Sequence, residues 1–82
     1  MTRIRLGELP KGEPARIVAV EGMAERLMEM GLLEGSTVEV LHEAPFSRDP
    51  IAVRVRGALI ALRRNEANHV WVERGQTGQG HE

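Results

Sequence analysis

The sequence contains no cysteine, so neither a disulfide nor a thiolate ligand or nucleophile can contribute to this protein. Aromatic residues are almost absent as well, because Phe46 and Trp71 are the only two. The core must therefore be aliphatic. The longest apolar run, at residues 58–62, is far shorter than the ~20 residues that span a bilayer. We expect a cytoplasmic protein that lies at the inner membrane only through a partner.

Length and charge narrow the range of functions further. The 82 residues accommodate one domain, and so small a domain has little volume for a deep, enclosed active site. Binding on the surface is therefore the better expectation. The formal net charge of −1 argues against a generic attraction to nucleic acid, so we expect no direct nucleic-acid partner.

Glycine and proline interrupt the chain at short intervals and leave β-branched segments of strand length between them. Residues 51–56 alternate cleanly, which predicts that Ile51, Val53 and Val55 face inward. Arg56-Gly57 then predicts a tight turn into the second strand of a hairpin. The expected fold is mainly β, a small SH3-like or OB-like barrel of five or six strands. Its recognisable strands are 14–20, 36–43, 51–56, 58–62 and 69–73.

One segment follows a helical rather than a strand period. Between Met23 and Met30 the apolar residues form one continuous arc at helical spacing, and Gly31 follows as a helix cap. This predicts one short helical insertion of about two turns. Residues 65–68 could add a single helical turn. The domain is expected to cover residues 1–73, and the glycine-rich segment 74–82, which has no hydrophobic residue, to be a disordered tail.

No residue pattern indicates catalysis. Serine and threonine occur without a recognisable nucleophile signature. Gly31 and Gly35 flank the end of the helix rather than its start, and the one lysine, Lys11, lies in a distant turn, so we predict no phosphate-binding loop. We predict no catalytic residue, no cofactor and no enzyme activity.

Histidine offers only weak candidates for a metal site. No two histidines have the spacing that places both on one helix face. His42 continues the alternation of Val38 and Val40, so we expect a partly buried structural histidine. No metal site is predicted, although weak binding of a divalent metal by His42 or His69 stays open.

Three features suggest a surface for a protein partner. Methionines on the helix would suit an adaptable interface, the hairpin arginines point outward, and the tryptophan is out of phase with two valines expected in the core. The alternatives are that the methionines pack the core, that the arginines only solvate the strands, and that neighbouring segments cover the tryptophan. The predicted contact residues are Met23, Arg26, Leu27, Met30, Arg54, Arg56 and Trp71.

An ordered series of short motifs resembles the FeoA family over residues 4–72. No single motif is specific, but their order and spacing are. They are Leu6-Gly-Glu-Leu9, Arg26-Leu27 with Gly31-Leu32, Val38-Glu-Val40, Asp49-Pro50-Ile51-Ala-Val53, Leu62-Arg63-Arg64-Asn-Glu66-Ala67 and Val70-Trp-Val72. The sequence departs from the family pattern at Trp71 and at Glu34, where proline is frequent.

The resemblance implies an SH3-like barrel with a helical insertion. It also implies a partner, the ferrous-iron transporter FeoB, which the protein would bind from the cytosolic side and regulate or scaffold. The alternative is a metal-sensing regulatory domain similar to the SH3-like domain of iron-dependent repressors. A homo-oligomer is also open, because an exposed edge strand or methionine patch could drive self-association.

Overall fold

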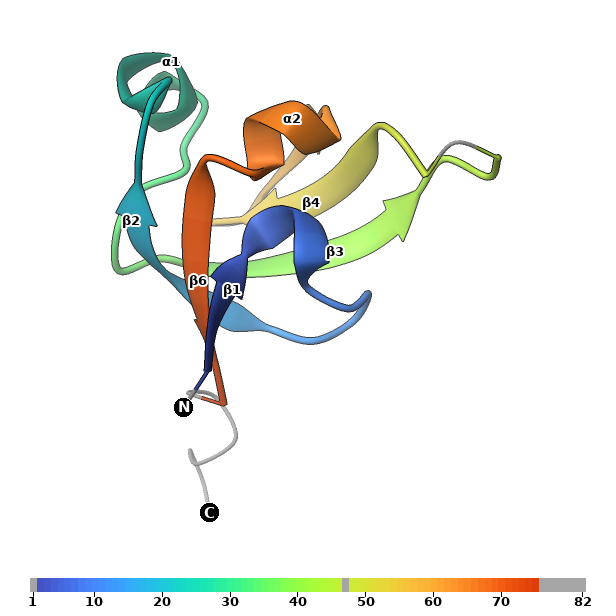
Figure 1. Cartoon of the computed structure of the whole chain (residues 1–82), viewed down its shortest axis with the longest axis horizontal. Helices are drawn as coiled ribbons and strands as arrows, with labels where there is room; N and C mark the ends of the chain where they lie inside the picture. Colours follow the sequence, from blue (N-terminus) through green and yellow to red (C-terminus); the bar gives the residue numbers. More distant parts are fainter. Residues whose placement is uncertain (1, 47, 76–82) are drawn as a thin grey trace.

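The computed structural model describes residues 2–46 and 48–75, and they form one strongly bent antiparallel sheet with short helices at one end (Figure 1). The strands follow the order β1-β6-β2-β3-β4-β5. The elements are β1 (Thr2–Arg5), η1 (Leu6–Glu8, a 3-10 turn), β2 (Ala15–Val20), α1 (Ala24–Glu29), β3 (Thr37–Glu43), β4 (Ile51–Val55), β5 (Ala58–Leu62), α2 (Arg64–Ala67) and β6 (Val70–Arg74).

The core is aliphatic and comes from one face of each long strand. Val38 lies opposite Val55, and Val40 opposite Val53, across β3 and β4. All four are buried, together with Ile51 on the same face of β4. The prediction that the odd-numbered residues of this strand face inward is confirmed. Period-2 alternation identified them because each strand has one face on the core and one in water.

Two irregularities change the phase of the strands. The register of β2 against β6 shifts between Ile17 and Ala19, and that of β3 against β4 shifts between Val40 and His42. The extra residue of a bulge turns the following side chain to the opposite face. His42 is therefore exposed, and the prediction of a partly buried structural histidine is wrong.

The helical part is larger than the single insertion predicted. α1 begins one residue after Met23 and ends before Met30. Gly31 follows at φ 105°, and its N–H donates to the Met28 carbonyl, so the predicted glycine cap is present. α2 forms at the position where a single turn was considered, and η1 adds a further turn.

The two ends of the domain meet in the sheet. β1 pairs with β6, with Thr2 opposite Arg74, which is why a sixth strand forms. Arg74 therefore lies in the sheet rather than in the predicted tail. Gly75, the next residue of the predicted tail, forms a turn, and residues 76–82 lie outside the described residues.

Candidate protein-interaction surface

The two histidines considered for metal binding lie in different surroundings. His42 is exposed on β3, whereas His69 is half-buried just before β6. A Cβ at Gly22 would lie 2.5 Å from the His69 Nδ1 atom, so the imidazole packs directly on this glycine. Within residues 2–46 and 48–75, no group of three or more histidine, aspartate or glutamate side chains could hold a metal ion.

α1 carries one exposed apolar side chain, Met28, beside a cavity. Met28 keeps 49% of its surface exposed. Together with Val20 of β2 and with Leu33 and Glu34 beyond the helix, it lines a cavity of ≈ 410 Å³. A flexible, polarizable methionine at the rim of such a hollow suits an adaptable contact with another protein.

The other predicted residues of α1 are less accessible. Leu27 is 0% exposed and belongs to the core, so its place in the predicted contact surface is corrected. Met23 and Met30 are partly buried and pack against the same core. Arg26 is exposed, and its guanidinium lies 3.1 Å from the Glu66 carboxylate of α2.

Met23 and Met30, the two methionines among the predicted contact residues, are partly buried, whereas Met28, which was not among them, is exposed. A helix advances ~100° per residue, so the buried position of Leu27 turns Met28 away from the core. Only packing on the barrel fixes that rotation.

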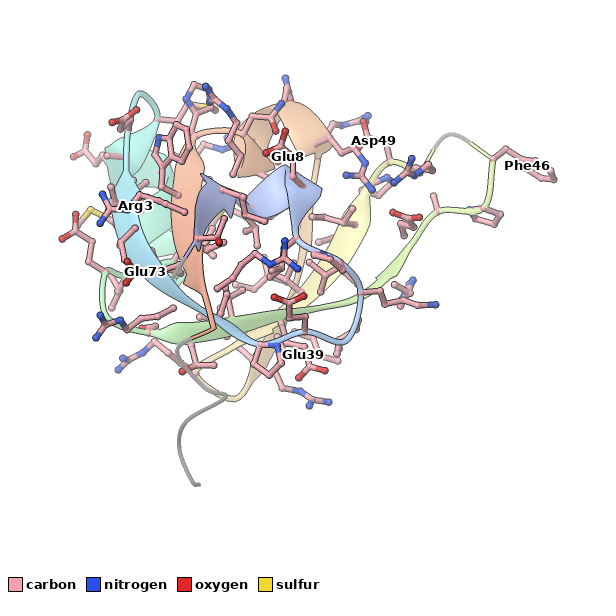
Figure 2. The ribbon with its side chains drawn as sticks, turned by 60° about the horizontal axis from the view of Figure 1, so that its bottom comes forward. Arg3, Glu8, Glu39, Phe46, Asp49 and Glu73 are labelled. Carbon is pink, nitrogen blue, oxygen red and sulfur yellow. The ribbon has the colours of Figure 1, made fainter. Side chains whose placement is uncertain are left out.

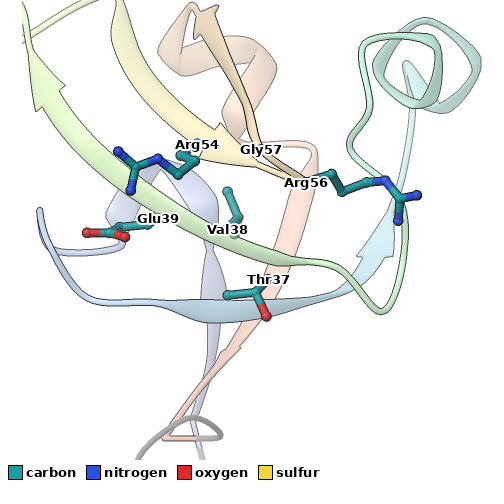
Figure 3. Close-up of a pocket in the computed structure, with 6 residues that line it drawn as sticks. All are labelled: Thr37, Val38, Glu39, Arg54, Arg56 and Gly57. Carbon is teal, nitrogen blue, oxygen red and sulfur yellow. The ribbon is translucent and has the colours of Figure 1, made fainter.

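The two predicted arginines of the β4–β5 hairpin are exposed but point to opposite sides (Figure 3). Arg56 extends toward the segment that joins α1 to β3, where its Nη1 lies 3.4 Å from the Ser36 hydroxyl oxygen. Arg54 lies opposite Glu39, and both arginines line a cavity of ≈ 230 Å³ that is separate from the one beside Met28. Only Arg56 is therefore brought toward the α1 side.

Trp71 is half-buried, and neighbouring side chains contact both its ring and its indole nitrogen. The Arg5 guanidinium lies 4.5 Å from the ring centroid, a cation–π geometry. The indole Nε1 donates to the Glu21 carboxylate at 3.2 Å. Arg5 therefore covers part of this ring.

Two exposed apolar side chains were missed from the sequence. Phe46 is fully exposed on the β3–β4 loop, which projects from the body of the domain (Figure 2). Leu59 of β5 is 69% exposed. An aromatic residue inside a polar, proline-flanked loop was the available signal for Phe46. For Leu59 the signal was strand alternation: Ile60 faces inward, so its neighbour Leu59 must face outward.

Arg64 fixes the base of the projecting loop. Its guanidinium donates to the Glu43 carboxylate, to the Gly7 carbonyl and, at 2.6 Å, to the Arg48 carbonyl. Its backbone N–H donates to the Asp49 carboxylate at 2.9 Å. One side chain thus joins η1, α2 and both sides of the β3–β4 loop.

The pKa of the Glu13 carboxyl, in the loop before β2, is lower than usual. Hydrogen bonds from the Arg74 guanidinium, at 2.6 and 2.8 Å, lower the pKa of this carboxyl below its ordinary 4.5, while slight burial acts in the other direction. The pair joins that loop to β6 and serves structure rather than chemistry.

The six bent strands and the helical insertion define a class, the small SH3-like barrel. The solved structure of Stenotrophomonas maltophilia FeoA complexed with zinc, described as a prokaryotic SH3 domain protein, matches at TM-score 0.76 and 32% identity over 85% of this chain and 89% of that one. A manganese-dependent transcriptional repressor in complex with manganese shares the fold at TM-score 0.80 and 20% identity, over 90% of this chain and 37% of the repressor.

The FeoA domain model matches residues 4–74. This chain belongs to the FeoA family. A Porphyromonas gingivalis relative, an Fe(2+) transport protein A/Fe(2+) transporter FeoB fusion protein, is 41% identical over 73 residues. That match covers 85% of this chain and 8% of the fusion protein. The expected SH3-like fold and the resemblance to FeoA are both confirmed. In the described part of the chain, no helix is long and apolar enough to cross a membrane.

Proposed function

We propose that this protein is a non-enzymatic accessory of ferrous-iron uptake that binds the cytosolic part of the FeoB transporter and regulates or scaffolds it. The observation that carries the proposal is the Porphyromonas gingivalis fusion, which places a related domain and the transporter in one chain. Fusion raises the effective concentration of one partner beside the other, which is useful where the two must touch. Here the same contact would form between separate molecules.

The contact surface that the structure supports is centred on Met28 rather than on Leu27. The hollow beside Met28 offers apolar lining from Val20 and Leu33. Met23 and Met30, which flank the same helix, are half-buried against the core, and Arg26 of this helix is exposed to a partner's acidic groups. Trp71 and Arg54 are secondary candidates, because one is already engaged and the other points away.

Binding of the purified domain to the soluble cytosolic region of FeoB, measured by calorimetry, tests this proposal. Met28→Glu should weaken binding by about tenfold or more, because it places a charge at the centre of an apolar contact. Phe46→Glu is the matched control, since it puts the same charge on a still more exposed apolar residue elsewhere. Both variants should give the far-UV circular dichroism of the parent domain.

The outcomes separate the partner from the surface. If the parent domain binds and Met28→Glu binds equally well, the transporter is the partner but α1 is not the contact. If the folded parent domain shows no binding with or without GTP and ferrous iron, the accessory role itself is overturned.

A metal-sensing role is the second candidate. It is favoured by the zinc complex of the Stenotrophomonas maltophilia relative and by the fold shared with a manganese-dependent repressor. Histidine NMR resonances followed during titration with Fe²⁺, Mn²⁺ and Zn²⁺ test it. A saturable shift of His42 or His69 at micromolar metal would support this role, and unchanged resonances at millimolar metal would exclude these ligands.

A further inference from the structure

The described sheet has two edge strands, and they differ in charge. β1 and β5 lie at the two ends of the strand order. β1 reads TRIR and carries the charged side chains of Arg3 and Arg5. β5 reads ALIAL and carries none. Because proteins usually protect an open edge with charged residues, proline or a covering segment, the apolar edge of β5 is unusual for a strand with no further function.

The hairpin geometry shows which backbone groups of β5 are open. A two-residue turn joins Val55 and Ala58, so these flanking residues form a hydrogen-bonded pair. Alternation along an antiparallel ladder then directs the N–H and C=O groups of Leu59 and Ala61 away from β4. In residues 2–46 and 48–75, we find no backbone hydrogen bond to either residue from another element. Two donors and two acceptors are therefore available to an incoming strand.

The side chains of this edge form an apolar row beside cationic groups. Leu59 is 69% exposed, and Ala61 on the same outer face is exposed as well. Arg54 lies opposite Leu59 in β4, and Arg63 directly follows β5. Neither guanidinium forms an ion pair within the described residues, although Glu39 lies opposite Arg54 in β3. Neither β4 nor β5 contains an acidic residue.

We propose that β5 is a docking edge for an extended segment of a partner protein, in which carboxylate side chains alternate with apolar ones. The segment would add a seventh strand through hydrogen bonds to Leu59 and Ala61. Because successive side chains of a strand alternate between the two faces, its carboxylates would lie on the outer face near Arg54 and Arg63, and its apolar side chains on the inner face beside Ile60. This inference goes beyond the accessory role, since it concerns a surface separate from Met28 and does not depend on the transporter.

A second copy of this chain is a poorer occupant of the edge. Antiparallel pairing of two β5 strands about Ile60 would place Leu59 against Ala61 of the other copy. The same register would bring Arg63 of one copy against the Arg56-Gly57 turn of the other. Like charges facing each other across strands are destabilising, whereas an acidic segment would relieve this charge.

The test uses the full chain and a synthetic ten-residue peptide that alternates glutamate with valine. A second peptide alternates lysine with valine, and a third has the acidic composition with proline replacing the central valines. We expect saturable binding of the first peptide, weakened by salt, and at least about tenfold weaker binding of the other two. On binding, the Leu59 and Ala61 amide protons should become protected from hydrogen exchange.

Two variants locate the contact. Leu59→Glu places a like charge beside the incoming carboxylates on the outer face and should weaken binding of the acidic-apolar peptide by about tenfold. Ala61→Pro removes an outward N–H without removing a bond to β4 and should act in the same direction. Phe46→Glu is the matched control, since it places the same charge on an exposed apolar residue of the projecting loop, and it should bind the peptide as the parent domain does.

Three results would overturn the proposal. The first is no binding of the acidic peptide to the folded domain. The second is equal binding of the acidic and basic peptides. The third is protection of the Leu59 and Ala61 amides that grows with protein concentration in the absence of peptide, which would make a second copy the occupant.

Discussion

The two short helices are held on the same barrel by different forces. α2 buries only the small side chain of Ala67 and is held besides by polar contacts, through the hydrogen bonds that Arg64 makes to other segments. α1 is attached mainly by apolar packing, through fully buried Leu27 and the partly buried methionines. Directional hydrogen bonds fix one geometry, whereas methionine packing adapts to change. The structure thus separates a rigid brace, α2, from an adaptable surface helix, α1.

The largest expected effect is at the apolar attachment of α1. Leu27→Ala should lower the free energy of unfolding by about 2–5 kcal/mol, because it leaves a cavity in a closely packed core. Met28→Ala, one residue later, should change it by less than about 0.5 kcal/mol. Urea unfolding of both variants measures the difference. Equal losses would mean that α1 is rotated from the position described here.

The polar attachment of α2 should give the next largest effect. Arg64→Ala should cost about 2–3 kcal/mol, since it removes the donor from two backbone carbonyls and from the Glu43 carboxylate. Arg63→Ala is the matched control at the preceding, exposed position, and a change within about 0.5 kcal/mol is expected. If the two arginines cost the same in urea unfolding, α2 is not braced through Arg64.

The two helices are also joined to each other by one ion pair. The Arg26 side chain is 64% exposed and the Glu66 side chain 12% exposed. A double-mutant cycle of Arg26→Ala and Glu66→Ala should give a coupling energy below about 1 kcal/mol, reduced by salt. A larger, salt-independent coupling would show that α1 depends on the same polar network as α2.

The smallest effect in this series is expected at Glu13, whose carboxylate pairs with Arg74 of β6 and should respond to acid. Its pKa is lower in the folded state than 4.5, so its contribution to stability is present above that value. The contribution is lost as the pH falls through the lowered pKa. Urea midpoints of Glu13→Gln measured from neutral pH into acid should therefore fall less steeply than those of the parent domain.

The partner of Glu13 supplies the check. Arg74→Gln should reproduce the shallower acid dependence, because the hydrogen bonds from Arg74 are what lower this pKa. A parent-like acid dependence in both variants would show that the pair contributes nothing measurable.

Local patterns predicted the fold but not the details of the site. Alternation identified the inward residues of β4, and the glycine after α1 identified the end of that helix. The same alternation failed at His42, because a bulge follows from the pairing of two strands rather than from the sequence of one. The seven predicted contact residues likewise include one core residue, Leu27, and omit exposed Met28, Phe46 and Leu59.

The sequence by itself determined the fold class, the aliphatic core and the family, because these depend on periods and motifs readable within short segments. Only the tertiary structure decided which edge of α1 is exposed, which arginine braces the loop and which strand edge is open. Arg64 contacts Gly7 and Glu43 across separations of 57 and 21 residues. Contacts of that kind arise from how the strands pair and how the helices rotate on the barrel, and no local pattern encodes either.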